Sequence, residues 1–392
     1  MLGSLPEESA MLKWCLASVV AGWASVAAAQ VDVVVTYLRL DDRKPPTLSD
    51  IDPDPADLGI AGARLGLADN ATTGQFLNHR YTLAEITETT AEALLAASRD
   101  AGGLIVVQAP APVVLAVADA HPDALIFNAA AADDSLRGTD CRANVMHTAP
   151  SFAMRADALA QFLVTKRWTD VALVTGPAPA DLAFADALRA SAAKFNLRLR
   201  GDAPWGFTGD IRRTTGAEVP SFTQRLGDFD MLLVADEIHD FGRYLNYNTW
   251  DPRPVGGSEG LTPVAWSPVV EQWGAEQLQS RFRDLAGRGM KATDYSAWAA
   301  VRAVGEAVTR TGTSDMATLR SYMLSPDFTL AGFKGRPLSF RSWNGQLRQP
   351  IPLVDARAIV AVAPLEGFLH PVTELDTIGG DAAESTCTAF GG

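Results

Sequence analysis

Short apolar runs alternate with amphipathic segments over the first part of this chain. From Val31 onward, the runs VDVVVTYL, RYTLAEIT, LIVVQ and ALIFNA are separated by segments in which apolar residues recur with helical spacing. Apolar strands of this kind are typical of a parallel sheet that helices cover on both faces, because both sides of each strand are then buried. The alternation therefore predicts an α/β fold.

The alternation begins again near residue 151. Two helical segments, each followed by a buried strand (DVALVTG and DMLLVAD), form a second α/β unit that runs to about Asp236. A Pro- and Gly-rich passage, two more helical segments and a hairpin with the turn Asn344-Gly345 follow. The late helices are best placed on the first unit, so we expect two lobes with a hinged cleft between them. The predicted segments are a signal peptide at 1–29, lobe 1 at 30–148 plus 262–330, lobe 2 at 149–261 plus 331–376, and a tail at 377–392.

The N-terminus has the pattern of an export signal. An apolar run follows Lys13 and ends in three alanines directly before Gln30, which predicts cleavage after Ala29 and a soluble protein in the periplasm. Cys15 has no lipobox before it, so a lipid anchor is not expected. Cleavage leaves Cys141 and Cys387, which can form one disulfide or remain two unpaired thiols in an oxidising compartment.

Charge and motifs exclude several classes of function. The net charge of −13 disfavours nucleic acid and anionic bilayers as main partners. The sequence contains no G-x-S-x-G elbow, P-loop, C-x-x-C or H-E-x-x-H, and its five histidines have no ligand spacing. Asp236-Glu237 at a strand exit lacks a companion nucleophile, so a hinge or ligand-orienting role is expected rather than catalysis. We therefore expect no enzyme and no catalytic cofactor.

Two helical segments resemble a known family. GIAGARLGLADNATTGQFL is similar to the first helix, and DYSAWAAVRAVGEAVTRTGT to a late helix, of type I periplasmic binding proteins of the branched-chain amino acid receptor group. The resemblance covers about Val31 to Pro371. It implies two Rossmann-like lobes joined by three crossovers, a small ligand trapped between them, and an ABC permease in the inner membrane as partner of a monomeric receptor.

The chain departs from that group where the amino acid is held. The loop after the third strand, rich in Ser and Thr in the group, is Ala109-Pro110-Ala111-Pro112 here, and the loop after the fourth strand is Ala129 to Asp134. Proline also removes amide donors. A free amino acid would leave charged ends unpaired there, at a cost of several kcal/mol, so leucine, isoleucine and valine are not expected to bind.

A narrower resemblance suggests a ligand. WGFTGDIRRTTGAEVPSFTQR and YNTWDPRPVGGSEGLTPVAW look like binding proteins associated with quinoprotein alcohol dehydrogenase systems. This resemblance implies pyrroloquinoline quinone, a planar tricarboxylate, as transported ligand, stacked on Trp rings and held by Arg forks. The alternatives are an amino acid, an amide or an alcohol-derived acid as ligand, or a sensor or interaction module for a dehydrogenase. The candidate ligand-binding residues are Arg39, Gln108, Ala109, Asn128, Trp205, Arg212, Arg213, Asp236, Glu237, Tyr247, Trp250, Arg253 and Trp266. Arg39 is expected directly after the first strand, and the rings of Trp205, Tyr247, Trp250 and Trp266 are expected in or near interlobe loops.

Overall fold

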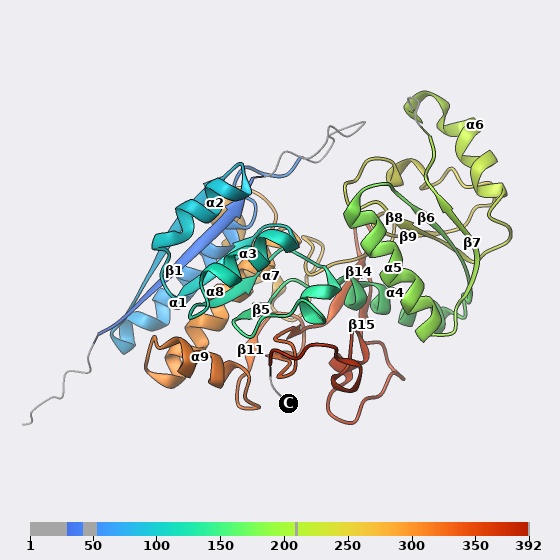
Figure 1. Cartoon of the computed structure of the whole chain (residues 1–392). Helices are drawn as coiled ribbons and strands as arrows, with labels where there is room; N and C mark the ends of the chain where they lie inside the picture. The colour runs from blue at the N-terminus through green and yellow to red at the C-terminus, as the bar shows by residue number, and fades with distance from the viewer. Residues whose placement is uncertain (1–29, 42–52, 208–210, 391–392) are drawn as a thin grey trace, which may run out of the picture.

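The structure is a computed structural model that describes residues 30–41, 53–207 and 211–390. Its helices and strands form two lobes that lie side by side (Figure 1). The expected signal peptide at 1–29 lies outside the described residues. Within the described part of the chain, no helix is both long and apolar enough to cross a membrane.

Lobe 1 is built on a five-stranded parallel sheet with the order β2-β1-β3-β4-β5. Helices α2 and α3 cover one face, and α1 and α8 cover the other. The strands are β1 (Val31–Leu40), β2 (His79–Glu88), β3 (Leu104–Gln108), β4 (Leu125–Asn128) and β5 (Val145–His147). The helices are α1 (Ile60–Leu77), α2 (Ala91–Ala97), α3 (Ala111–Ala120), α7 (Ala275–Ala286), α8 (Ala292–Thr311) and α9 (Met316–Met323).

Lobe 2 contains a four-stranded parallel sheet with the order β7-β6-β8-β9. Helices α4 and α5 pack on one face and α6 on the other, where it stands at the outer end of the lobe (Figure 1). The strands are β6 (Asp170–Thr175), β7 (Arg198–Pro204), β8 (Met231–Ala235) and β9 (Val255–Gly257). The helices are α4 (Phe152–Lys166), α5 (Pro179–Lys194) and α6 (Ile211–Gln224).

Two small antiparallel sheets complete the fold. The sheet β10-β14-β15 packs against lobe 2, and the sheet β11-β12-β13 packs against lobe 1. Their strands are β10 (Thr262–Pro263), β11 (Leu330–Ala331), β12 (Pro337–Phe340), β13 (Leu347–Arg348), β14 (Ile351–Val354) and β15 (Ile359–Ala363). Up to β15 the chain therefore passes between the lobes three times, after β5, at β10 and between β13 and β14. The hairpin expected at Asn344-Gly345 is confirmed, with Gly345 at a φ of 68°.

Two of the predicted boundaries differ from the structure. Leu338, Phe340 and Leu347 belong to the core of lobe 1, although residues 331–376 were all expected in lobe 2. The segment expected to be a tail is also packed, because Ile378 is fully buried in the core of lobe 2. Apolar side chains in a hairpin show that it is buried but not against which lobe, so the sequence pattern misassigned it.

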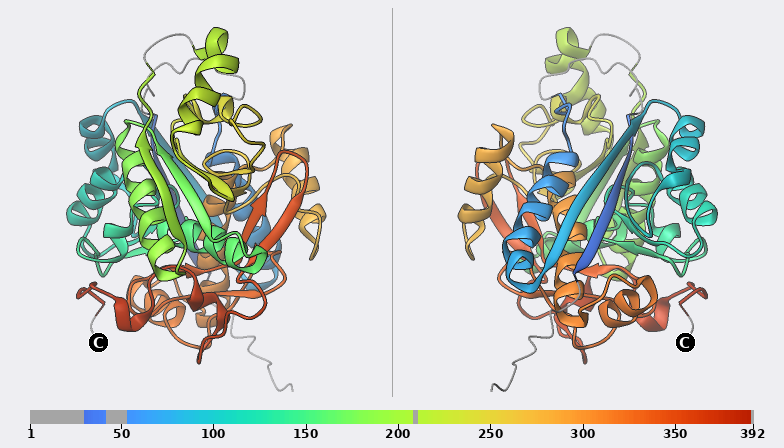
Figure 2. Two further views of the ribbon diagram at one scale, coloured as in Figure 1. Left: turned by 90° about the vertical axis from the view of Figure 1, so that its right-hand side faces the viewer. Right: turned by 90° about the vertical axis from the view of Figure 1, so that its left-hand side faces the viewer.

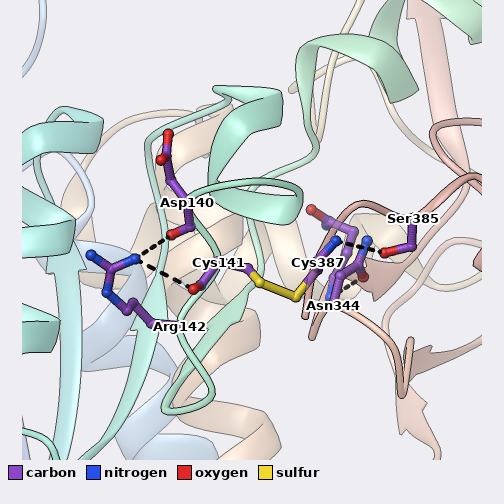
Figure 3. The surroundings of a disulfide bond; sticks show 7 residues. Asp140, Cys141, Arg142, Asn344, Ser385 and Cys387 are labelled. Atoms are coloured by element: carbon purple, nitrogen blue, oxygen red, sulfur yellow. Dashed lines mark hydrogen bonds between the residues drawn. A yellow bond between two sulfur atoms is a disulfide. The ribbon is translucent and has the colours of Figure 1, made fainter. Parts of the chain in front are cut away.

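Cys141 and Cys387 form a disulfide with a Cα–Cα distance of 5.7 Å (Figure 3). Cys141 follows the short helix η2 (Asp134–Arg137) of lobe 1, and Cys387 lies in the C-terminal segment. Of the two states that the sequence left open, the structure has the bonded one. The disulfide ties the end of the chain back to lobe 1.

Helices α1 and α8 pack closely enough to bury polar groups between them. A Cβ added to Gly62 would lie 1.9 Å from the backbone oxygen of Asp294. Asn70 is 2% exposed and donates to the backbone oxygen of Val301 at 2.7 Å. Asn70 begins the sequon Asn-Ala-Thr, and its burial within α1 leaves it inaccessible to glycosylation in this fold.

Candidate ligand-binding site

The strand orders place one switch point in each lobe. The order reverses between β1 and β3 in lobe 1 and between β6 and β8 in lobe 2. Open parallel sheets bind ligands outside the carboxyl ends of strands at such points. The candidate site therefore consists of the loops that follow these four strands and their neighbours β4 and β9.

The lobe 1 part of the site is poor in hydrogen-bond donors. Ala109 and Ala111 are buried, and Pro110 is the N-cap of α3. Pro112 has no N–H, and the N–H of Val113 donates to the Pro110 oxygen at 3.0 Å. The first turn of α3 thus has few amides left for an anion, in agreement with the interpretation of the Ala-Pro run.

Asn128 accepts hydrogen bonds from backbone amides of the alanine-rich loop after β4. Its side chain is fully buried, and Oδ1 accepts the N–H groups of Ala130 and Ala131 at 3.1 and 2.9 Å. Its Nδ2 donates to the Ala131 oxygen at 2.7 Å. Asn128 was predicted to contact ligand, but in this structure its side chain is committed to holding the loop.

The other predicted polar residues of lobe 1 also have partners in the protein. Arg39 is the second-to-last residue of β1, not part of the loop after it as expected, and its guanidinium donates to Asp41 at 2.8 Å and to the Ala56 oxygen. Gln108 Oε1 accepts the Tyr37 hydroxyl at 2.6 Å. Because Arg39 is 7% exposed, it is poorly placed as a fork for a ligand carboxylate.

The lobe 2 part of the site centres on a bidentate ion pair. Arg155, in the first turn of α4, donates to both oxygens of Glu237 at 2.6 and 2.9 Å, and the two side chains are 14% and 16% exposed. Ser258 Oγ also donates to Glu237, at 2.7 Å. Burial is the largest single influence and works to raise the pKa of Glu237, but the charge and hydrogen bonds of Arg155, the hydrogen bond from Ser258 and the charge of His239 together outweigh it, so the pKa lies below its ordinary value. Glu237 is therefore a carboxylate at neutral pH.

Two further carboxyls support the Glu237 backbone and its loop. Asp181, at the start of α5, accepts the N–H of Glu237 at 2.6 Å, and burial raises the pKa of Asp181 to about 6. Asp236 is fully buried and accepts three backbone amides of the following loop, at 2.6 to 2.9 Å. Burial also raises the pKa of Asp236, against the effect of those amides. Asp236 thus closes a turn rather than facing a ligand.

A histidine and a fourth carboxyl complete this edge. His239 Nδ1 lies 2.9 Å from Glu259, and this hydrogen bond raises the pKa of the imidazole. The side chains of this edge include one arginine, Arg155, and four carboxyls, Asp181, Asp236, Glu237 and Glu259. Glu237, Glu259 and His239 retain some exposure, so the accessible part of the edge suits a ligand group that is cationic or donates hydrogen bonds.

Two of the predicted tryptophans pack inside their own lobes. Trp266 is 1% exposed and stacks on Tyr295 in the core of lobe 1, with ring centroids 4.7 Å apart. It was expected in an interlobe loop, and its burial leaves no free face for a ligand ring in this structure. Trp205 follows β7 and stacks on Phe241 at 4.5 Å, within an aromatic cluster of lobe 2.

The remaining predicted residues lie away from the switch points. Trp250 and Arg253 line a pocket of about 160 Å³ with Asp228, at the amino end of the lobe 2 sheet. Arg253 pairs with Asp228 at 2.9 Å, and Tyr247 is 94% exposed on the same connection. Arg213 is on α6 at the outer end of the lobe, and the side chain of Arg212 lies outside what the structure describes. The arginines expected to gather around a tricarboxylate are therefore not brought together.

Sequence reasoning missed Arg155 and Ser258. Both lie beside Glu237, which it did select, but they come from α4 and from the turn after β9. One signal was present in the sequence: Arg155 lies in the first turn of α4, the helix that follows the first passage between the lobes. Pairs of neighbouring arginines drew the prediction elsewhere, although a single well-placed arginine suffices for a bidentate contact.

Known structures share this fold. A periplasmic ligand-binding protein of a branched-chain amino acid ABC transporter from Burkholderia xenovorans LB400 superposes with a TM-score of 0.71 at 16% identity, over 92% of this chain and 100% of that one. A leucine-, isoleucine-, valine-, threonine- and alanine-binding protein from Brucella ovis, in a closed conformation, superposes with a TM-score of 0.67 at 13% identity, over 86% of this chain and 93% of that one. An amino acid ABC transporter substrate-binding protein from Pseudomonas fluorescens Pf-5 superposes with a TM-score of 0.65 at 13% identity, over 92% of this chain and 99% of that one.

These likenesses give the chain the two-lobed fold of type I periplasmic binding proteins, which confirms the predicted fold class. No family model and no curated protein matches the sequence. At these identities the comparisons define the fold, and the ligand has to be argued from the residues of the site.

Proposed function

We propose that this chain is a periplasmic solute-binding protein that captures a small ligand between its lobes and delivers it to the permease of an ABC importer. The fold supports this function, since the similar structures are described as periplasmic ligand-binding or ABC transporter substrate-binding proteins. Export through a signal peptide cleaved after Ala29, action as a monomer and the absence of catalysis belong to the same proposal. A periplasmic sensor would use the same fold and site.

One observation carries the choice of ligand. The switch-point loops of lobe 1 have few free donors, while those of lobe 2 present the carboxylates of Glu237 and Glu259. A free α-carboxylate would find weak support at the first set of loops and repulsion at the second. A cationic amine or the N–H groups of an amide would instead meet an edge rich in carboxylates, where Glu259, paired with the exposed His239, is more exposed than the doubly paired Glu237. The ligand that fits best is an amine or an amide with an apolar body.

Pyrroloquinoline quinone is the second candidate. The exposed Pro110 and Pro112 and the partly exposed Ala130 and Ala132 of the loop after β4 are apolar, which favours a flat apolar ring. Its three carboxylates, however, need cations. Arg155 is paired with Glu237, and Arg39 is paired with Asp41. An amine or amide is therefore preferred over the quinone.

A thermal-shift panel on the mature chain tests this proposal. The panel contains primary amines, amino acid amides, free amino acids and pyrroloquinoline quinone. A true ligand at about 100-fold excess over its Kd stabilises the folded state by about 2.7 kcal/mol. We expect the stabilising compounds to be amines or amides, and Glu237→Gln and Glu259→Gln to weaken binding at least tenfold while the surface control Arg99→Ala does not. Stabilisation by the quinone alone would overturn the ligand choice.

A further inference from the structure

The C-terminal segment, residues 374–390, forms a strap at the base of both lobes, at the end of the molecule away from α6 (Figure 2). Its first anchor is on lobe 1. Asp376 is 2% exposed and accepts from Arg341 and Arg348 at 2.9 Å each. Both arginines belong to the hairpin β12–β13, whose apolar side chains are in the core of lobe 1.

The second anchor is on lobe 2, only three residues further along. The N–H of Gly379 donates to Asp157 of α4 at 2.9 Å, and its oxygen accepts from Lys194 of α5 at 3.0 Å. Lys194 and Asp157 are themselves paired at 2.8 Å. Ile378, between the anchors, is buried in the core of lobe 2, and its backbone oxygen accepts from the Arg341 guanidinium at 2.7 Å.

The spacing of these anchors limits relative motion. A chain spans at most about 3.3–3.6 Å per residue, so three residues reach about 10 Å. Asp376 and Gly379 cannot separate beyond that reach while both anchors hold. Rotation of one lobe away from the other at its base must therefore break one anchor or stay small.

The disulfide attaches the strap to lobe 1 a second time. Cys387 lies eight residues after Gly379 and is bonded to Cys141. Phe390 beyond it packs over Arg320 of α9, with 5.1 Å between the guanidinium carbon and the ring centroid. The strap thus runs from lobe 1 to lobe 2 and back. Loss of the Asp376 anchor alone would leave it attached to both lobes.

We propose that this strap, closed by Cys141–Cys387, restricts how far the two lobes open. It adds a covalently closed connection to the three passages of the chain and so shifts the population of the ligand-free protein toward less open states. This inference rests on the two-lobed fold and needs neither the importer function nor a ligand.

Small-angle X-ray scattering of the ligand-free mature chain tests the strap. The variants are Cys141→Ser/Cys387→Ser and the same pair with Asp376→Asn. We expect the radius of gyration to rise and the distance distribution to extend to longer distances, more in the triple variant than in the double one. Hydrogen exchange at Gly379 should become about tenfold faster or more, because its hydrogen bond opens more often.

Arg198→Gln, which removes an exposed ion pair on the far edge of lobe 2, is the control and should leave the scattering unchanged. If the serine variants do not fold, reduction of the folded wild-type protein with a phosphine replaces them. A disulfide that merely stabilises lobe 1 would lower the melting temperature without changing the scattering. That outcome, in both the double and the triple variant, would overturn the proposal.

Discussion

Asn128 holds the alanine loop of lobe 1 from inside the protein. Its replacement by alanine removes the acceptor of the buried Ala131 amide and of the partly buried Ala130 amide, and a buried group without a partner costs about 1–3 kcal/mol. We expect Asn128→Ala to lower the free energy of unfolding by about 2–4 kcal/mol in urea titrations. Gln75→Ala, on the exposed side of α1, should stay within about 0.5 kcal/mol of wild type. Equal stability of the two variants would contradict the role given to Asn128.

Asp181 makes stability depend on pH. Its pKa is raised from the ordinary 3.8 to about 6, so the folded state binds a proton more tightly than the unfolded state. This contribution to stability is complete below about pH 4 and is lost as the pH rises through 6. The free energy of unfolding of wild type should therefore exceed that of Asp181→Asn by more at pH 4 than at pH 7. This change between the two pH values should be at most about 3 kcal/mol. A difference that grows with pH instead would show that the pKa is lowered.

Single residues of the site were harder to predict than their loops. Glu237 was selected because it follows a buried strand, and in the structure that strand, β8, borders the switch point of lobe 2. Trp266 and Trp250 were selected as rings in or near expected interlobe loops, but the first is core and the second is at the opposite end of its sheet. A tryptophan in a hydrophobic core and a tryptophan in a ligand-binding site have the same sequence pattern. Only the residues packed around it distinguish the two cases.

At the scale of elements, the contact between α1 and α8 depends on small residues. Gly62→Ala would push a methyl group into the backbone of Asp294. The clash is with backbone atoms, so no side chain can rotate away to relieve it. We expect a loss of stability of about 3 kcal/mol, at the upper end of typical overpacking. Gly216→Ala in α6 meets no atom within 4 Å and should instead stabilise by about 0.5–1 kcal/mol. Thermal unfolding of both variants checks the pair, and a tolerated Gly62→Ala would contradict the close approach of the two helices.

Elements with apolar patterns were predicted well, and polar ones were missed. The runs that form β1, β3, β4, β6 and β8 lie in the structure where they were expected. Strand β7 was missed because RLRGDAP is polar, as suits an exposed edge of the sheet. Helix α6 was missed because Gly216 and Pro220 interrupt it. The periodicity of apolar residues indicates which elements are buried, so it does not reveal exposed edge strands or exposed helices.

At the scale of the whole molecule, the proposed function divides the tasks of binding between the two lobes. Lobe 1 contributes exposed apolar residues such as Pro110 and Pro112, and lobe 2 contributes carboxylates beside Arg155, so the proposed ligand is expected to contact both lobes. The long connections that bring Glu237, Ser258 and Arg155 together were beyond sequence reasoning, because contact across three elements leaves no local pattern. The two-lobed arrangement itself followed from the repeated alternation of strands and helices.

The measurement that tests this division of tasks most directly is isothermal titration calorimetry of the mature chain with three related compounds: leucine, leucinamide and an amine of the same body without the carboxyl group. The shared apolar body leaves the carboxylate as the variable. We predict that leucine binds at least tenfold more weakly than leucinamide or the amine, and that Glu237→Gln abolishes the difference. Micromolar binding of leucine, equal to or tighter than that of its amide, would contradict the proposed site.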